Sequence, residues 1–295
     1  HYSYNWPLAV IKKYVKNRFI AIGILTLLSL IRFGQEVKHY DFNVDINVKD
    51  KLVEVDGFIE VDFQNKDSIE LILWKKTIIK SIQSENKEMV YTFNTESKSP
   101  SQYIPKGSSL IITNHGNEKG YSKIYFSYQC NMTEMNIWGN QFNEDWVELG
   151  IYSAWYPVNL KSQNFTSSLK VTADENYIIN GSGLVTENLG KYTILHYWNI
   201  FDNVIIASKD LKQRSFSNEN STVDLLYSDF PESDIDSLFY IISDVIYFYT
   251  KLFGTNAKDN YLKFVLVPGS KGGYSRAKYI SYTANKYNEK LLGGI

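Results

Sequence analysis

The sequence contains a single cysteine, Cys130, in a chain of 295 residues. One cysteine cannot form an intrachain disulfide, and it also excludes the Cys-x-x-Cys pairs of zinc ribbons and redox proteins. A reactive thiol needs a histidine or another positive neighbour, and "SYQCNMT" contains neither. We therefore predict that Cys130 is a buried structural residue and that burial of apolar surface stabilises the fold.

Excess charge and histidine are also scarce. The 31 basic and 32 acidic residues give a net charge of -1, so nucleic acid is not expected as a partner. The histidines are His1, His39, His115 and His196. None has another histidine four residues away, so the sequence contains no H-E-x-x-H zinc motif. We predict that His196 is packed or paired within a strand and that His115 lies in a turn.

No apolar run reaches the length of about 20 residues that a membrane-spanning helix needs. The run "FIAIGILTLLSLI" at 19–31 has 13 residues. It follows a basic segment that contains Lys12, Lys13, Lys16 and Arg18. Such a segment before a short apolar core is typical of an export signal. We predict that residues 1–36 direct export to the periplasm, the extracellular space or the membrane, with a membrane anchor as the alternative. The first residue is His1 rather than Met, and we expect the natural chain to begin upstream.

Aromatic residues, by contrast, are abundant: they make up 15% of the chain, with 23 tyrosines. Tyr and Phe favour pleated, half-buried surfaces. Alternation of apolar and polar residues predicts strands at 41–48, 52–63, 69–74, 109–114, 123–130, 167–173, 192–198 and 203–208. Their regular spacing indicates a sandwich or a curved open sheet. An aromatic carbohydrate-binding face would give the same composition, so composition does not separate a core from a site.

The pattern changes after the polar stretch "DLKQRSFSNENST" at 210–222. Residues 231–254 have the spacing of a helix with one apolar face. That face contains Ile235, Leu238, Phe239, Ile242, Val245, Ile246, Tyr249 and Leu252. A strand is predicted to follow at 261–268. We therefore predict a β domain at 37–212 and the beginning of an α/β domain at 222–295.

Three short motifs have competing interpretations. "PGSKGGYS" at 268–275 does not fit a phosphate loop, because Lys271 precedes the glycines instead of following them. "NGSGLVT" at 180–186 starts like a dinucleotide fingerprint, but Thr186 stands at its last position and no helical pattern follows. We predict a hairpin turn there. "NEDWVE" at 143–148 offers paired carboxylates for glycoside hydrolysis, and a solvated charged turn is the preferred interpretation.

The order of these segments resembles the front of the gluzincin zinc aminopeptidases, the family of membrane alanyl aminopeptidase and leukotriene hydrolase. The stretch "AWYPVNLKSQNFTSSLKVTADENYIINGSGLVTENLGKYTILHYW" at 154–198 is similar to the saddle domain of that family. "FYTKLFG", "KFVLVP" and "GGYSR" follow in the order of the helix, strand and Gly-x-Met-Glu-Asn loop that open its catalytic domain. The resemblance covers roughly 40–295. It implies a mainly β fold, with a curved β saddle or sandwich domain and the incomplete start of an α/β thermolysin-like catalytic domain.

The resemblance also implies a zinc-dependent peptidase that acts on peptides or proteins, with a substrate-binding role for the loop. Gly272 and Gly273 match the glycines that let an edge strand approach a peptide closely. Tyr274 takes the Met position, Ser275 the Glu position and Arg276 the Asn position. In the family, the loop Glu is the anionic partner of the free amine of the substrate. Serine cannot supply that charge, so strict exopeptidase specificity is not expected.

Another carboxylate would have to replace the loop Glu, and Glu148 is our candidate. The H-E-x-x-H of the family, which supplies two zinc ligands and a general base, would begin where this sequence stops. We therefore expect zinc in a full-length parent protein, and neither zinc binding nor peptidase activity in this chain alone. The alternative from a different class is a non-catalytic surface β protein that binds peptide or carbohydrate.

Overall fold

The computed structural model describes residues 36–64, 66–85, 87–114, 121–137, 139–162, 164–217, 222–253, 261–269 and 273–284. These residues belong to one compact unit. The predicted export segment up to residue 35, the predicted turn at His115 and the loop residue Gly272 lie outside the described residues.

No helix in the described part of the chain is long and apolar enough to cross a membrane.

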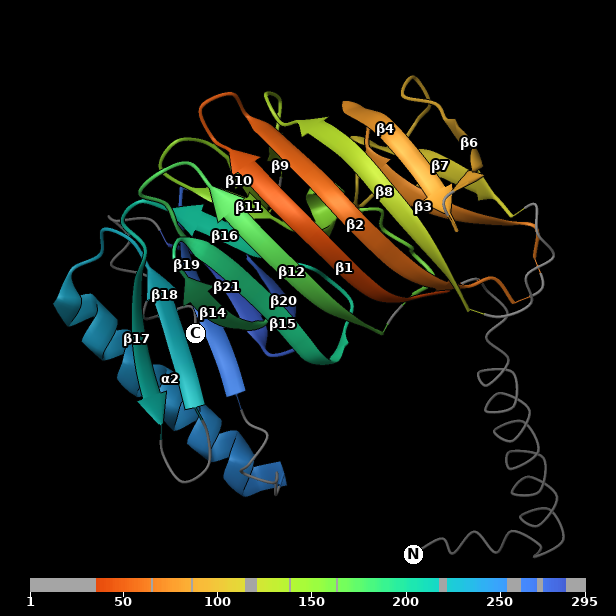
Figure 1. Cartoon of the computed structure of the whole chain (residues 1–295). Coiled ribbons are helices and arrows are strands. Elements are labelled where there is room, and N and C mark those ends of the chain that lie inside the picture. The colour runs from red at the N-terminus through yellow and green to blue at the C-terminus, as the bar shows by residue number, and fades with distance from the viewer. Residues whose placement is uncertain are drawn as a thin grey trace, which may run out of the picture. The chain divides into compact units, whose positions relative to one another are not determined.

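The largest sheet has the strand order β14-β15-β12-β1-β2-β8-β4-β5 (Figure 1). Its strands are β1 (Glu36–Asn47), β2 (Leu52–Asp62), β4 (Thr77–Ser84), β5 (Lys87–Glu88), β8 (Tyr121–Asn131), β12 (Phe165–Ala173), β14 (Leu184–Asn188) and β15 (Lys191–Ile200). Neighbouring strands are antiparallel except β1 and β12, which are parallel. In β1, buried Val44 and Ile46 alternate with exposed Asn43 and Asp45. This period of two buries one face of the sheet, as the sequence pattern predicted.

Two smaller sheets supply apolar side chains to the same core. One has the order β13-β16-β11-β10-β9 and the other β3-β7-β6. Their strands are β3 (Ser68–Trp74), β6 (Val90–Phe93), β7 (Gly107–Thr113), β9 (Asn136–Ile137), β10 (Asn140–Phe142), β11 (Val147–Leu149), β13 (Ile178–Gly181) and β16 (Ile205–Ser208). Trp74 and Trp155 are among the large buried side chains of this core. A sheet packed on other sheets around one core confirms the predicted mainly β fold.

Cys130 is fully buried in this core, as predicted. Its sulfur lies 3.1 Å from Oγ1 of Thr77. Burial raises the pKa of the Cys130 thiol to about 12. The thiolate form is therefore disfavoured, which fits a structural role and not a reactive one.

A second mixed sheet follows, with the order β17-β18-β19-β21-β20. Its strands are β17 (Lys212–Ser217), β18 (Thr222–Tyr227), β19 (Tyr261–Pro268), β20 (Tyr274–Arg276) and β21 (Tyr279–Ala284). The central strands β18, β19 and β21 are parallel, and the outer strands β17 and β20 are antiparallel to their neighbours. Helix α2 (Glu232–Phe253) connects β18 to β19, as a parallel pair requires. This arrangement has the α/β character predicted for the segment, and the predicted division into domains at 37–212 and 222–295 stays a prediction.

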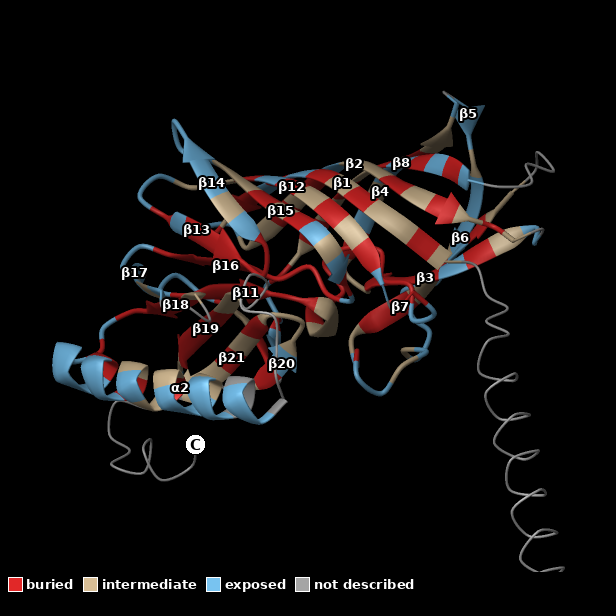
Figure 2. Cartoon of the chain, turned by 90° about the horizontal axis from the view of Figure 1, so that it is seen from below, coloured by how far each residue is buried: buried red, intermediate tan, exposed pale blue. Residues whose placement is uncertain are grey.

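Helix α2 buries a narrower face than its sequence pattern predicted. Ile235, Leu238 and Ile242 are buried against the sheet. Val245 is 39% exposed and Leu252 is 60% exposed, so these two residues of the predicted apolar face are not buried. They lie about 60 and 80° around the helix axis from Ile242, at the margin of the buried face. Figure 2 shows the outer face of α2 as exposed along its length.

The predicted hairpin at 180–186 is also wrong. β13 pairs with β16 and β14 pairs with β15, so the chain passes here from one sheet to another. The glycines serve close packing. A Cβ on Gly181 would lie 2.3 Å from the carbonyl oxygen of Val204, and one on Gly183 would lie 2.6 Å from that of Leu195. Only glycine allows such an approach of two backbones.

A buried lysine connects this crossing to the second sheet. Nζ of Lys263 in β19 donates hydrogen bonds to Oδ1 of Asn180 at 2.6 Å, to the Gly181 carbonyl at 2.8 Å and to the Gly183 carbonyl at 2.9 Å. Lys263 is 1% exposed. Three oxygens therefore replace the water that an ammonium group loses on burial.

Replacing Lys263 should destabilise the fold. In Lys263→Met the oxygens of the crossing lose their donor, and we expect the free energy of unfolding to fall by about 2–4 kcal/mol. Urea denaturation followed by circular dichroism measures this loss. The control Lys170→Met removes an exposed strand lysine and should change stability by no more than about 0.5 kcal/mol. Equal stability of the two variants would contradict a fastening role for Lys263.

Candidate functional site

The candidate site is built around β20, the last strand of the second sheet. β20 pairs with β21 along one side, and in the described residues no strand pairs with its other side. A Cβ on Gly273 would lie 2.4 Å from the carbonyl oxygen of Ser281, so the entry to β20 requires glycine. An open edge of this kind offers backbone donors and acceptors to an extended peptide.

Glu148 of β11 lies directly behind this edge strand and is fully buried. Its Oε1 accepts hydrogen bonds from the hydroxyl of Tyr274 at 2.5 Å and from Oγ of Ser281 at 3.0 Å. Its Oε2 and Nε1 of Trp146 both lack a well-formed hydrogen bond. The indole is still close enough to lower the pKa of the carboxyl. One carboxylate thus connects β11 to both strands of the β20–β21 pair.

Burial raises the pKa of Glu148 to about 7. Hydrogen bonds from Tyr274, Ser281 and Trp146 oppose this shift, and the negative charge of Asp202 adds to it. Desolvation is the largest effect because the carboxyl is fully buried. The carboxyl therefore gains or loses its proton close to neutral pH.

A second buried carboxylate holds the other end of β20. Nε of Arg276 donates to Oδ2 of Asp202 at 2.7 Å. The side chain of Asp202 is 0% exposed and that of Arg276 is 9% exposed. Burial raises the pKa of Asp202, while the Arg276 charge and its hydrogen bond lower it. A buried ion pair of this kind requires both partners, because a lone charge there would be unsolvated.

Aromatic rings surround the Arg276 guanidinium. Its carbon lies 4.3 Å from the ring centre of Tyr274, 5.0 Å from that of Tyr152 and 5.2 Å from that of Phe201. Tyr274 also stacks on Tyr279, with ring centres 6.0 Å apart. Cation–π contacts and ring stacking therefore hold both ends of β20 in place.

The structure brings most of the predicted site residues together. Those that it describes are Gly273, Tyr274, Ser275, Arg276 and Glu148. Ser275 is exposed, whereas Tyr274 is turned inward onto Glu148. For "NEDWVE", the turn residues at 143–145 are exposed, as predicted for a charged turn, but Glu148 is buried and does not belong to it. The substrate-binding role of these residues stays a prediction.

Sequence analysis missed the partners that hold the site. Asp202 follows a predicted strand end without any motif, and Tyr152 lies in η1 (Ile151–Ser153), a single 3-10 turn that the sequence analysis did not predict. Tyr279 and Ser281 alternate in "KYISYT", and that period of two was the one available signal that both point to the same face. Their buried contacts depend on packing between distant segments, which no local pattern encodes.

His196 is buried and paired, as predicted. Its Nδ1 lies 2.7 Å from Oγ of Ser167 and its Nε2 lies 3.0 Å from Oγ of Ser182. Burial lowers its pKa to about 3, and the charge of Lys263 contributes. In the described part of the chain, no group of three His, Cys, Asp or Glu side chains is arranged to hold a metal ion.

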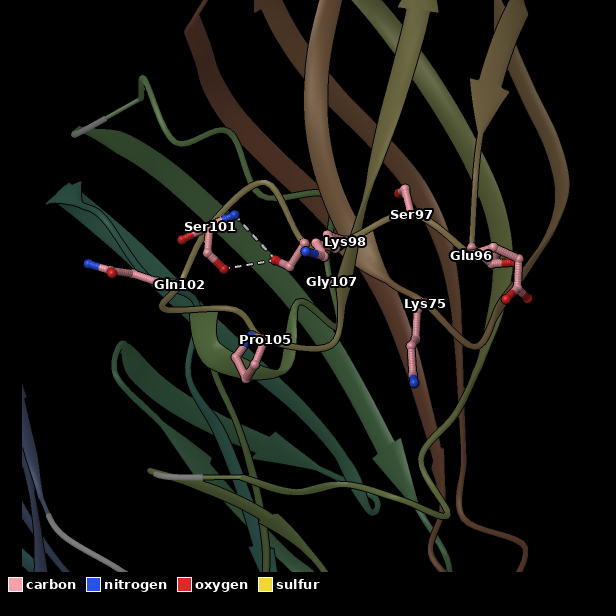
Figure 3. Close-up of a pocket in the computed structure, with 10 residues that line it drawn as sticks. Lys75, Glu96, Ser97, Lys98, Ser101, Gln102, Pro105 and Gly107 are labelled. Atoms are coloured by element: carbon pink, nitrogen blue, oxygen red, sulfur yellow. Dashed lines mark hydrogen bonds between the residues drawn. The ribbon is translucent and has the colours of Figure 1, made fainter.

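A separate surface cavity of about 510 Å³ lies at the β6–β7 connection (Figure 3). Its lining includes Lys75, Glu96, Lys98 and Gln102, which are polar and belong to segments distant in sequence from β20. The hydroxyl of Ser99 folds back onto the loop and donates to the Ser101 carbonyl at 2.8 Å. None of the residues that surround β20 contributes to this cavity.

Replacing Glu148 should change how stability depends on pH. The folded-state pKa lies above the unfolded value, so stability from this group is present below about pH 4.5 and lost as pH rises through about 7. Relative to wild type, Glu148→Gln should therefore gain up to about 3 kcal/mol between pH 5 and 8. Denaturant titrations across that range measure the gain. The control Glu144→Gln, in the exposed turn, should show the same dependence of stability on pH as wild type. If Glu148→Gln also shows the wild-type dependence, the pKa of Glu148 is not raised.

Removing one partner of the buried ion pair should be costly. Asp202→Ala leaves the Arg276 charge without its partner, and we expect a loss of about 3–5 kcal/mol in unfolding free energy. The double variant Asp202→Ala with Arg276→Met removes that orphaned charge and should recover part of the loss. The exposed pair of Glu54 and Lys80 gives the control, because Glu54→Ala should cost less than about 1 kcal/mol. A double variant no more stable than the single one would argue against an orphaned charge.

Comparison with known proteins places this fold. No family model and no curated protein matches the sequence. Among solved structures, the M1 zinc metallopeptidase from Deinococcus radiodurans has a TM-score of 0.62 and 15% identity. Yeast LTA4 hydrolase, in complex with bestatin, has a TM-score of 0.65 and 14% identity. A mutant of the Deinococcus enzyme bound to a Tyr-Ser-Ala substrate has a TM-score of 0.62 and 14% identity.

The matches cover most of this chain but only part of those proteins. They include 88% of this chain and 62% of the Deinococcus protein, and 84% of this chain and 40% of the yeast protein. At such low identity the likeness concerns the fold. The chain therefore has the fold of the N-terminal part of M1 zinc metallopeptidases, as the sequence resemblance implied.

Proposed function

We propose that this chain is the N-terminal portion of an exported, zinc-dependent metallopeptidase that hydrolyses peptide bonds. The observation that carries the proposal is the position of β20, an open edge strand in a fold shared with M1 zinc metallopeptidases. One of the similar structures holds a Tyr-Ser-Ala substrate, which supports a short peptide as the ligand class.

In this proposal, β20 binds the backbone of an extended peptide. The peptide adds to the sheet as a further strand, and main-chain hydrogen bonds provide the affinity. By the resemblance, Gly272 and Gly273 would permit the close approach of the peptide, and exposed Ser275 would lie beside it. Tyr274 and Arg276 are already fixed by buried carboxylates. The edge is therefore preorganised, which lowers the entropy cost of binding.

The residues described do not fit a zinc ion. A catalytic zinc site uses three protein ligands and an open position for water, and the described residues contain no such group. We propose that a longer parent polypeptide carries the zinc ligands and the general base, and that this chain alone binds peptide without cleaving it.

The location of the protein is also a proposal. Residues 19–31 and the basic residues before them support export and allow membrane association of the N-terminal segment. The balanced net charge of -1 gives no support for a nucleic-acid partner.

A non-catalytic binding protein is the alternative, and one surface favours it. On the outer face of β2 and β8, the rings of Phe58 and Tyr125 lie 5.6 Å apart, and Nζ of Lys123 lies 4.3 Å from the Phe58 ring centre. Tyr121 on the same strand is 71% exposed. Exposed aromatic rings beside polar groups can stack on sugars. Binding to a glycan array with no binding to peptides would favour this alternative.

Peptide binding to β20 tests the main proposal. The probe is the hexapeptide Tyr-Ser-Ala-Ala-Ala-Lys, acetylated and labelled with fluorescein on the lysine, and binding is followed by fluorescence anisotropy. We expect Gly273→Val to weaken binding by about tenfold or more, because the added side chain displaces β20 from β21. The control Ser275→Ala should bind like wild type, because it leaves the backbone intact.

The outcomes separate the parts of this proposal. Equal binding by wild type and a folded Gly273→Val variant would contradict a site at β20. Circular dichroism checks the fold of each variant. Peptide hydrolysis by this chain with added zinc, abolished by a chelator, would contradict the claim that the chain alone is inactive.

A further inference from the structure

The charged groups around β20 determine which peptides the edge can favour. A peptide with a free N-terminus presents an ammonium group, and its binding improves where an accessible carboxylate pairs with it. A peptide bound through an internal segment, or with an acylated N-terminus, has no such requirement. In the described part of the chain, the carboxylates bonded to side chains of β20 are Glu148 and Asp202.

Glu148 is closed to a ligand. It is fully buried, and its Oε1 accepts from both Tyr274 and Ser281. Its Oε2 lacks a well-formed hydrogen bond but is buried as well, so an ammonium group reaches neither oxygen without moving the side chains that cover Glu148. Moving Tyr274 would also separate its ring from Tyr279 and from Tyr152, whose ring centre lies 5.9 Å away. The hydrogen bonds and ring contacts of Tyr274 thus keep Glu148 from acting as an amine receptor.

Asp202 is neutralised as well. It is buried and already bonded to Arg276 and, through Oδ1, to the hydroxyl of Tyr156 at 3.3 Å. The guanidinium of Arg276, a cation, covers Asp202 and is itself 9% exposed. An ammonium brought to this position would meet a like charge, which disfavours it. The exposed side chain between the two anchors is Ser275, which is neutral.

We infer that β20 accepts peptides through an internal or N-terminally blocked segment, and that a free N-terminal amine gains no affinity there. The inference rests on the proposed function and specifies its substrate class. Glu148 is sealed, Asp202 is neutralised and Ser275 is uncharged. Among the described residues that contact β20, these groups leave the amine without a partner. Burial and geometry carry this conclusion.

The experiment compares matched peptides. Tyr-Ser-Ala-Ala-Ala-Lys carrying fluorescein on the lysine is prepared with a free and with an acetylated N-terminus. Anisotropy titrations at about pH 6.5 keep the free amine charged. We expect the free-amine peptide to gain no affinity over the acetylated one, so that the two dissociation constants agree within about threefold.

A gain-of-function pair sharpens the test. Ser275→Glu adds a carboxylate on the exposed side of β20, and Ser275→Gln adds the same shape without charge. We expect Ser275→Glu to tighten binding of the free-amine peptide by about tenfold and to leave the acetylated peptide unchanged. The gain should shrink as salt is added, because screening weakens exposed ion pairs. Ser275→Gln should change neither peptide.

Each outcome bears on one claim. If wild type binds the free-amine peptide about tenfold more tightly than the acetylated one, the inference is overturned while the proposed function stands. If Ser275→Glu gains nothing, the argument that this position lacks only a charge is wrong. If neither peptide binds wild type, the proposed function fails, and the inference fails with it.

Discussion

Every buried charge needs a partner, and the ion pair between Asp202 and Arg276 meets this requirement with residues from two distant segments of the chain. Arg276 lies on β20, whereas Asp202 lies between β15 and β16, in the part of the chain that forms the larger core. Because either charge alone would be unsolvated, the pair fixes where β20 can lie. The remaining contacts of the site are built around that position.

Two further buried polar groups are also satisfied by partners from other segments. Glu148 accepts from Tyr274 and Ser281, and Lys263 donates to three oxygens of the β13–β14 crossing. In each case a polar side chain on one sheet is satisfied by groups from another. These bonds give direction to an interface whose apolar packing alone would allow sliding. The second sheet is thus held in one register against the first.

A rigid edge strand follows from this arrangement. Ordinary edge strands are short or charged, which protects a protein against unwanted pairing. β20 is short, and its side chains at both ends point into buried contacts, which leaves the neutral Ser275 between them. The carboxylates that hold the strand already accept hydrogen bonds from its own side chains, so they do not offer a negative charge to a ligand. The structural role of Glu148 and Asp202 and the charge that the edge offers to a ligand are therefore connected.

Local patterns in the sequence predicted much of the fold. Alternating residues marked the long strands β1, β2 and β8, and the helical spacing marked α2, because each element buries one face. The same patterns overextended that face to Val245 and Leu252. They also predicted a hairpin turn at 180–186, whereas the glycines there allow close backbone contacts with Val204 and Leu195. Periodicity shows which side of a helix or strand is apolar, but it does not show how much of that side the adjacent sheet covers.

The sequence by itself therefore determined the mainly β class, the helix, the structural cysteine and the glycine-containing segment that enters β20. The resemblance also implied that Ser275 stands where the family has an acidic residue, and this correspondence stays a prediction. Only the tertiary structure decided that Glu148 is sealed by Tyr274 and that Arg276 meets Asp202. Those contacts join residues 126 and 74 positions apart, and burial and hydrogen-bond geometry at such separations arise from packing of whole sheets.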